Sequence, residues 1–336
     1  MKVFFCLLLL ALLVCAAPAF ANVTVYSPGE NARVVSPFWL SAVASPCSSQ
    51  PVAAMGYSFD ESSNTTIVNG TSISAVIGFA TGGHVLHIKS WGNKGASCVS
   101  DVNLTVVPPP TSMVPSWAGK ASQVQTMGGW SAVDDVATGL GVSTGITNIV
   151  GTPSVTGYAR EFTTTFSNYS GERYDAIFGV DPTAQNFLYD GWVNFANPSS
   201  EIANLEMDVN QVMANGQTVI FGFQCDGYSG TWDYTVNSGT AQKPNDIWRH
   251  SYSECNPREW STNTWHHIQI SYSRDQYGNV CYKSVWLDNV ESDLYIIVPS
   301  AFALNWSPTL LTNFQVDGGT GGSAKVYLDN LTIYWW

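Results

Sequence analysis

Polar and apolar side chains alternate over residues 205–211, which read Leu-Glu-Met-Asp-Val-Asn-Gln. Successive side chains of a β-strand point to opposite faces of its sheet. We therefore expect Glu206, Asp208 and Asn210 to share one face while the apolar residues between them enter a core. Two carboxylates and an amide in a row can bind the hydroxyl groups of a sugar or take part in its cleavage. A calcium site and a merely solvated strand face are the alternatives.

The same row is similar to the laminarinase-type hydrolase motif, in which Glu, Asp and Glu alternate along one strand. Carried over by position, the resemblance implies that Glu206 is the nucleophile and Asp208 its helper. The acid/base position falls on Asn210 or Gln211, neither of which can donate and recover a proton. A retaining glycosidase needs two carboxyls about 5–5.5 Å apart, so an amide at the acid/base position argues against a retaining mechanism. An inverting mechanism would instead use a more distant carboxylate, for which the candidates are Asp226, Asp233 and Glu254.

Aromatic residues accompany polar ones in the second half of the chain, as in Trp232-Asp233-Tyr234. Sugar rings stack on aromatic faces, and their hydroxyls need amide or carboxylate partners. The alternative is that each Trp is simply core, where large aromatic side chains dominate. The predicted carbohydrate-binding residues are Asn210, Gln224, Trp232, Tyr234, His267 and Trp286.

His266 and His267 are neighbours, so they face opposite sides of a strand. We expect His266 to be structural, whereas His267 shares a face with Gln269 and is the better functional candidate. A polysaccharide lyase needs a neutralising group and a base, for which the candidates are Gln224, His267, Arg249 and Tyr252.

No phosphate-binding loop, dinucleotide fingerprint or Gly-x-Ser-x-Gly motif occurs in the sequence, and no cofactor is expected. Asp317 and Asp329 are candidate ligands of a structural calcium ion. They lack the regularly spaced carboxylates of an EF-hand loop.

The N-terminus predicts export. Lys2 precedes an apolar run over residues 4–16, and Ala19-Phe20-Ala21 is a small-x-small cleavage site, so residues 1–21 are typical of a secretory signal peptide. An oxidising destination makes disulfides the default for the cysteines that follow. We expect the pairs Cys47–Cys98 and Cys225–Cys255, with Cys281 left unpaired.

The composition limits the partners. The net charge of −12 argues against nucleic acid, because binding there requires a basic surface. No stretch after residue 21 has 18 consecutive apolar residues, so no membrane insertion is expected after signal cleavage. The expected partner is a polysaccharide or cell-surface glycan, met outside the cell or at its surface.

Short strands with frequent turn signals predict an all-β chain of two domains. Residues 22–107 resemble bacterial immunoglobulin-like modules in "VTVYSPGENARVVSPFWLSAVA" and "GGHVLHIKSWGNKG". Residues 108–118 begin with three prolines and predict an extended linker. Residues 119–336 resemble concanavalin A-like lectin/glucanase (jelly-roll) sandwiches in "TWHHIQISYSRDQYGNVCYKSVWLDNV" and "AKVYLDNLTIYWW". Most of the mature chain also resembles uncharacterised secreted bacterial proteins that join two such domains.

Three functions fit these patterns. The leading one is a secreted protein that binds a polysaccharide on the concave face of the second sandwich. The second is a glycoside hydrolase or polysaccharide lyase that uses Glu206 on that face. The third is a structural or adhesive surface protein without a sugar site. Fold alone does not choose among them.

Overall fold

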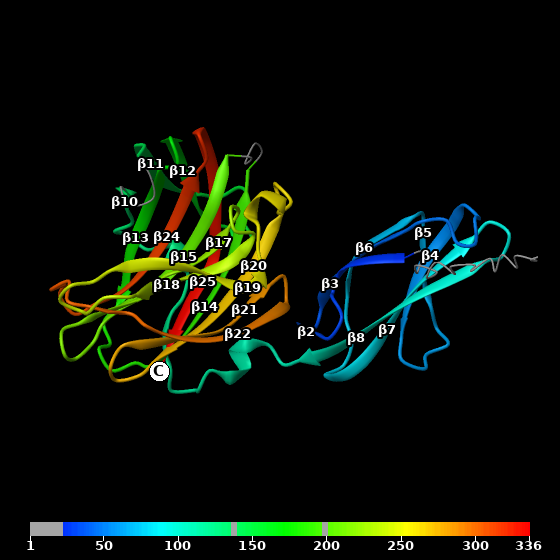
Figure 1. Cartoon of the computed structure of the whole chain (residues 1–336), viewed down its shortest axis with the longest axis horizontal. Coiled ribbons are helices and arrows are strands. Elements are labelled where there is room, and N and C mark those ends of the chain that lie inside the picture. The colour runs from blue at the N-terminus through cyan, green and yellow to red at the C-terminus, as the bar shows by residue number, and fades with distance from the viewer. Residues whose placement is uncertain (1–22, 136–139, 197–200) are drawn as a thin grey trace, which may run out of the picture. The chain divides into compact units, whose positions relative to one another are not determined.

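A computed structural model of the chain describes residues 23–135, 140–196 and 201–336. The described residues form strands and three short 3-10 helices, so the predicted all-β class is confirmed (Figure 1). None of those helices is long and apolar enough to cross a membrane. The expected export signal, residues 1–21, lies outside the described residues. The helices are η1 (Pro110–Met113), η2 (Val124–Thr126) and η3 (Pro257–Glu259).

The chain forms two compact units. Each is described separately below. The first comprises residues up to Glu30, Leu40–Ala75 and His84–Asn103, and the second comprises Asn31–Trp39, Val76–Gly83 and Leu104–Trp336.

Residues 23–107 contribute a three-stranded sheet and one run of strands within a larger sheet. One has the strand order β1–β3–β6, and the other contains the order β2–β8–β7–β4–β5 with β2 parallel to β8. Buried apolar residues such as Leu40 and Ile88 alternate with exposed ones along these strands, which is the pattern of half-buried sheets. The strands are β1 (Val23–Ser27), β2 (Ala32–Val35), β3 (Phe38–Ala44), β4 (Val52–Phe59), β5 (Thr66–Asn69), β6 (Ser72–Ile77), β7 (Gly82–Gly92) and β8 (Ser97–Val107).

A nine-stranded antiparallel sheet in the second unit carries the row of polar residues. Its main strand order is β10–β13–β24–β15–β17–β18–β19, and β16 and β23 attach beside β15. Figure 1 shows β13, β24 and β15 side by side, as their pairing requires. The strands are β10 (Ser131–Asp135), β13 (Gly171–Gly179), β15 (Ile202–Val212), β16 (Thr218–Phe221), β17 (Phe223–Asp226), β18 (Thr231–Asn237), β19 (Asp246–Glu254), β23 (Ala301–Phe302) and β24 (Leu310–Gly318).

A second sheet of the same unit contains the order β11–β12–β25–β14–β20–β21–β22, with β9 pairing β25. Aromatic residues from both sheets form the core between them. Phe314 of β24 stacks on Phe162 of β12, for example, at 4.8 Å between ring centroids. The strands are β9 (Gly119–Ala121), β11 (Ser143–Val150), β12 (Ala159–Ser167), β14 (Asn186–Phe195), β20 (Trp265–Arg274), β21 (Asn279–Leu287), β22 (Val290–Pro299) and β25 (Gly321–Trp335).

The apolar run 217–225 forms two strands instead of the continuous one that its sequence predicts. Gly222 separates β16 from β17. A Cβ atom at Gly222 would lie 2.5 Å from the side chain of Thr235, which belongs to the neighbouring strand β18. Glycine at this position therefore lets the chain pass close to β18.

The proline-rich segment 108–118 contains a helical turn that its pattern does not predict. Pro109 is extended, and Pro110 then opens the 3-10 helix η1. The fixed φ of proline suits an extended spacer and equally the first turn of a helix. The prediction of an extended linker over 108–118 is therefore wrong at residues 110–113.

Both predicted disulfides are confirmed. Cys47 pairs with Cys98, Cys225 pairs with Cys255, and Cys281 is free. The second bridge links β17 to the residue that follows β19, and both of its cysteines belong to the buried core.

Replacing Cys225 and Cys255 together with alanine should lower the free energy of unfolding. The bridge spans 30 residues, for which the chain-entropy relation gives about 3–4 kcal/mol. Urea unfolding of the double variant measures the loss, and Cys281→Ala is the control because this thiol makes no bridge. An unchanged urea midpoint in the double variant would contradict the assignment.

Candidate functional site

Strand β15 places its side chains as the alternation predicts. The odd-numbered side chains from Leu205 to Val209 have no exposed area and lie in the core. Glu206, Asp208 and Asn210 therefore point to the other face of the sheet. They too are at least nine-tenths buried, so the expectation of a solvated strand face is wrong.

The polar row extends sideways onto neighbouring strands. In β24, Gln315 lies directly opposite Glu206, and in β13, Arg173 lies opposite Gln315. Directly opposite residues of an antiparallel pair project from the same face. The adjacent row has the same arrangement and consists of Asp208, Asn313 and Asp175.

An open cavity of about 770 Å³ lies over these rows. This volume falls within the roughly 300–1,000 Å³ typical of small-molecule sites. The cavity belongs entirely to the second unit. Its polar and charged lining comprises Asp135, Arg173, Asp175, Glu206, Asp208, Asn210, Thr235, Asp246, Ser307, Thr309, Asn313 and Gln315.

Two tryptophans line the same cavity and remain accessible. Trp248 comes from the edge strand β19, and Trp306 from the loop 303–309 between β23 and β24. Their exposed fractions are 36% and 41%. Part of each indole side chain is thus accessible to a ligand that enters the cavity.

Several polar atoms of the cavity wall have no partner. Asn210 Oδ1, Asn313 Oδ1 and Thr309 Oγ1 are buried without a hydrogen bond, and each of the three residues is at least 91% buried. Leaving a buried acceptor unpaired costs about 1–3 kcal/mol. Each such atom in a folded protein calls for an explanation, and a bound water or ion is one of them.

Glu206 and Asp208 form a close carboxyl pair. Asn313 Nδ2 lies 3.3 Å from Glu206 Oε1 and 3.4 Å from Asp208 Oδ2, and the backbone N–H of Phe223 donates to Asp208 Oδ1 at 2.9 Å. Burial, and then the neighbouring Asp208, hold the pKa of Glu206 well above its usual range. Burial also raises the pKa of Asp208 to about 7. The pair therefore retains a proton under mildly acidic conditions.

Two further donors of the cavity, on Arg173 and Gln315, are engaged with carboxylates. Arg173 Nε lies 3.2 Å from the Asp175 carboxylate. Gln315 Nε2 donates to Asp135 Oδ2 at 2.8 Å and to Asp317 Oδ1 at 2.9 Å. Burial raises the pKa of Asp317 to about 7.

Two predicted aromatic contacts are wrong. Trp232 is 1% exposed and stacks on Phe223 in the core, at 5.2 Å and 7° between planes. Tyr234 packs half-buried against the same core, near Tyr282. The alternation of β18 turns both side chains inward, while Asp233 between them faces the polar side.

The other predicted contacts divide between the two sheets. Gln224 lies opposite Glu206 on the polar face. His267 of β20 and Trp286 of β21 belong to the second sheet, where His267 Nε2 lies 2.7 Å from Asp190 Oδ1 and the imidazole stacks on Trp192. The prediction that they share a site with Asn210 is wrong.

The residues named for a lyase do not converge either. His267 is on the second sheet, and Tyr252 of β19 is fully exposed. Arg249 lies opposite Tyr234, so it projects from the other face than Gln224 does.

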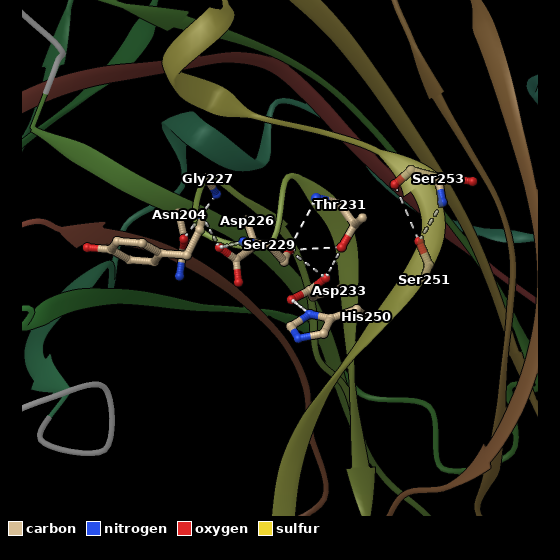
Figure 2. Close-up of polar contacts among 10 residues, drawn as sticks. Asn204, Asp226, Gly227, Ser229, Thr231, Asp233, His250, Ser251 and Ser253 are labelled. Carbon is tan, nitrogen blue, oxygen red and sulfur yellow. Dashed lines mark hydrogen bonds and ion pairs between the residues drawn. The ribbon is translucent and has the colours of Figure 1, made fainter.

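One group of metal-type side chains lies beside the cavity rows. Figure 2 shows Asp226, Asp233 and His250 converging, with their ligand atoms within 4.8 Å of one another. His250 Nδ1 lies 2.8 Å from Asp233 Oδ2, and Thr231 Oγ1 donates to Asp233 Oδ1 at 2.6 Å. Burial raises the pKa of Asp233, and the hydrogen bonds from Thr231 and His250 oppose this effect only in part. These contacts account for Asp233 and His250 as a hydrogen-bonded pair supported by the Thr231 hydroxyl.

The predicted calcium pair is wrong. Asp317 belongs to β24 and Asp329 to β25, in different sheets. The Asp329 carboxylate instead ties down the loop 154–156, accepting from Ser154 Oγ at 2.6 Å and from Thr156 Oγ1 at 2.5 Å. Burial raises the pKa of Asp329, but these hydrogen bonds outweigh it and leave the pKa lowered.

Gln211 is also removed from the site. It points to the core side, where its Nε2 donates to the carbonyls of Asp181 and Ala184 at 2.7 and 3.0 Å. Of the two residues considered for the acid/base position, only Asn210 therefore reaches the cavity.

The sequence pattern missed several cavity residues. Trp248, Trp306, Asp175 and Asp246 line it without having been singled out. The alternation of β13 could have located Asp175. Trp306 lies in a loop, whose path the strand pattern does not predict.

Comparisons with known proteins give no close relative. No family model matches the chain, and no curated protein matches it. These two comparisons leave the family of the chain open.

Solved structures show distant likeness only. A carbohydrate-binding module of the β-sandwich superfamily is 11% identical with a TM-score of 0.35, over 92% of this chain and 96% of that one. The cellulose-induced protein Cip1 is 12% identical with a TM-score of 0.35, over 56% and 85%. A carbohydrate esterase of the Shiga toxin-encoding bacteriophage phi24B is 12% identical with a TM-score of 0.36, over 65% and 99%. Likeness this distant carries no argument about function, which rests on the cavity.

Replacing Asp208 with asparagine should stabilise the fold increasingly as the pH rises. The folded state holds the pKa of Asp208 near 7, against about 3.9 in an unfolded chain. The folded state therefore binds more protons between about pH 4 and 7, and wild-type stability falls as the pH rises through that window. One pKa unit corresponds to about 1.4 kcal/mol, so the gain at pH 8 is of the order of 2–4 kcal/mol.

The measurement is the difference in melting temperature between variant and wild type across the window. Asp293→Asn, on the exposed part of β22, makes the same chemical change away from the cavity. A difference for Asp208→Asn that does not grow with pH would show that the carboxyl is not buried as described.

Proposed function

We propose that the chain is an exported saccharide-binding protein whose polysaccharide or cell-surface glycan occupies the cavity over the nine-stranded sheet. One observation carries the proposal: accessible Trp248 and Trp306 share a cavity with the buried, unpartnered oxygens of Asn210 and Asn313. A sugar ring offers both kinds of complement. Its C–H faces pack on indoles, and its hydroxyls pair with amide and carboxylate oxygens.

The fixed position of each group supports a ligand-binding site and not an incidental hollow of the surface. Asn210 and Asn313 project from paired central strands, which hold them rigidly. The Trp306 loop is anchored at both ends, where Ala303 N donates to Ala241 O at 2.8 Å and Val212 N to Thr309 O at 3.0 Å. A preorganised site loses little side-chain freedom when its ligand binds.

Export and domain roles are part of the proposal. The two disulfides are compatible with an oxidising compartment. We assign residues 22–107 as an immunoglobulin-like spacer or adhesion module, and 119–336 as a concanavalin A-like sandwich that holds the glycan on a concave face.

A glycoside hydrolase is the second candidate, favoured by the raised pKa of Glu206 at the cavity wall. A carboxyl that keeps its proton can act as a general acid. A retaining mechanism would need a second carboxyl about 5–5.5 Å from Glu206, and the acid/base position of the strand holds Asn210, which cannot transfer a proton. Inversion would use a more distant carboxylate of the lining, such as Asp175 or Asp246.

Replacing Trp306 with alanine should weaken glycan binding at least about tenfold, or about 1.4 kcal/mol, because the ring platform is lost. The measurement is calorimetric titration with the glycan selected from a polysaccharide panel. Trp117→Ala is the matched control, since Trp117 is 73% exposed and outside the cavity lining.

Equal losses in the two tryptophan variants would contradict the assignment to the cavity. Absence of binding across the panel would instead favour a structural or adhesive protein without a sugar site. Reducing ends released by wild type but not by Glu206→Gln would establish the hydrolase.

A further inference from the structure

We infer that the glycan held by this cavity carries free amino groups, as in a glucosamine-containing polysaccharide. This inference rests on the proposed function and adds the chemical class of the ligand. It follows from two features of the wall, its charge and its excess of hydrogen-bond acceptors.

The charge of the lining is one-sided, although the Glu206–Asp208 pair retains a proton and burial raises the pKa of Asp246 to about 6. Among the described lining residues the only base is Arg173, and the adjacent Asp175 already pairs with it. A uronic acid or sulfated sugar would bring further negative charge to this wall. Repulsion of this kind selects against such ligands. The acids of the lining are Asp135, Asp175, Glu206, Asp208 and Asp246.

The hydrogen-bonding capacity is equally one-sided. The Nδ2 group of Asn313 is directed at Glu206 and Asp208, which leaves its Oδ1 unpartnered. The Nε2 group of Gln315 donates to two carboxylates. Asn210 Oδ1 is a further unpartnered acceptor. The two unpartnered amide oxygens of the wall therefore need donors.

An ammonium group meets that need better than the other substituents of sugars. It has three donors and no acceptor, whereas a hydroxyl brings two acceptor lone pairs with its one donor. An ammonium bound to carboxylates also forms charge-assisted hydrogen bonds, which are roughly twice as strong as neutral ones. Trp248 and Trp306 add ring faces that attract both sugar C–H groups and cations.

The test uses three oligosaccharides of equal length with the same β-1,4-linked glucose backbone. They differ only at carbon 2, which carries a hydroxyl in cello-oligosaccharide, an amine in chitosan oligosaccharide and an N-acetyl group in chitin oligosaccharide. Titration calorimetry at about pH 6 keeps most of the amines protonated. We expect the amine to bind at least about tenfold more tightly than the hydroxyl series. The advantage should shrink between about 0.05 and 0.5 M NaCl.

Two variants locate the selectivity. Asp246→Asn removes one carboxylate of the lining and should reduce the preference for the amine about threefold or more, with little change for cello-oligosaccharide. Asp293→Asn removes the same charge from an exposed site outside the lining and should leave the preference unchanged. Equal effects of the two variants would show that only the net charge of −12 acts, and would overturn the inference.

The remaining outcomes separate this inference from the proposed function. Equal or tighter binding of the neutral oligosaccharide, lost in Trp306→Ala, overturns the amine inference and retains the saccharide site. No binding by any member of a wide glycan panel overturns both. Oligolysine of equal charge binding as tightly as the amino sugar would reveal a general cation site and overturn the inference.

Discussion

The two-residue period of strand β15 is the constraint on which the second unit depends. Its odd side chains, including Met207, have no exposed area because they form the core between the sheets. Its even side chains consequently have only the cavity face available, so Glu206, Asp208 and Asn210 must be accommodated there. A shift of one residue in register would exchange the two sets. Core packing therefore holds the polar row in place, and the site is rigid because the fold is.

This arrangement has an energetic consequence. Two carboxyls in contact and unpaired amide oxygens on a sheet face oppose folding, and the raised pKa of Asp208 measures part of that opposition. A chain that only needed a stable sandwich could carry Thr or Val at these positions. Destabilised polar groups cluster where a ligand will complete them, and the accessible Trp306 beside them is consistent with such a ligand.

Much of this organisation follows from residue patterns. Alternation located β15 and its polar face, and cysteine spacing predicted both disulfides. The sequence pattern gave wrong predictions where tertiary structure determines the position of a side chain. Trp232 shares the sequence context of a sugar contact but lies in the core, because burial depends on which face of β18 it occupies. Trp306 lies in a loop, and its position follows from tertiary hydrogen bonds at Ala303 and Thr309 that no local signal encodes.

The most direct measurement is a crystal structure of the protein with an oligosaccharide chosen from a binding panel. The account predicts ordered sugar in the cavity, with a ring against Trp306 or Trp248 and hydroxyl or amino groups within hydrogen-bond distance of Asn210 Oδ1 and Asn313 Oδ1. Sugar bound only elsewhere, for example on residues 23–107, while this cavity holds none, would contradict it.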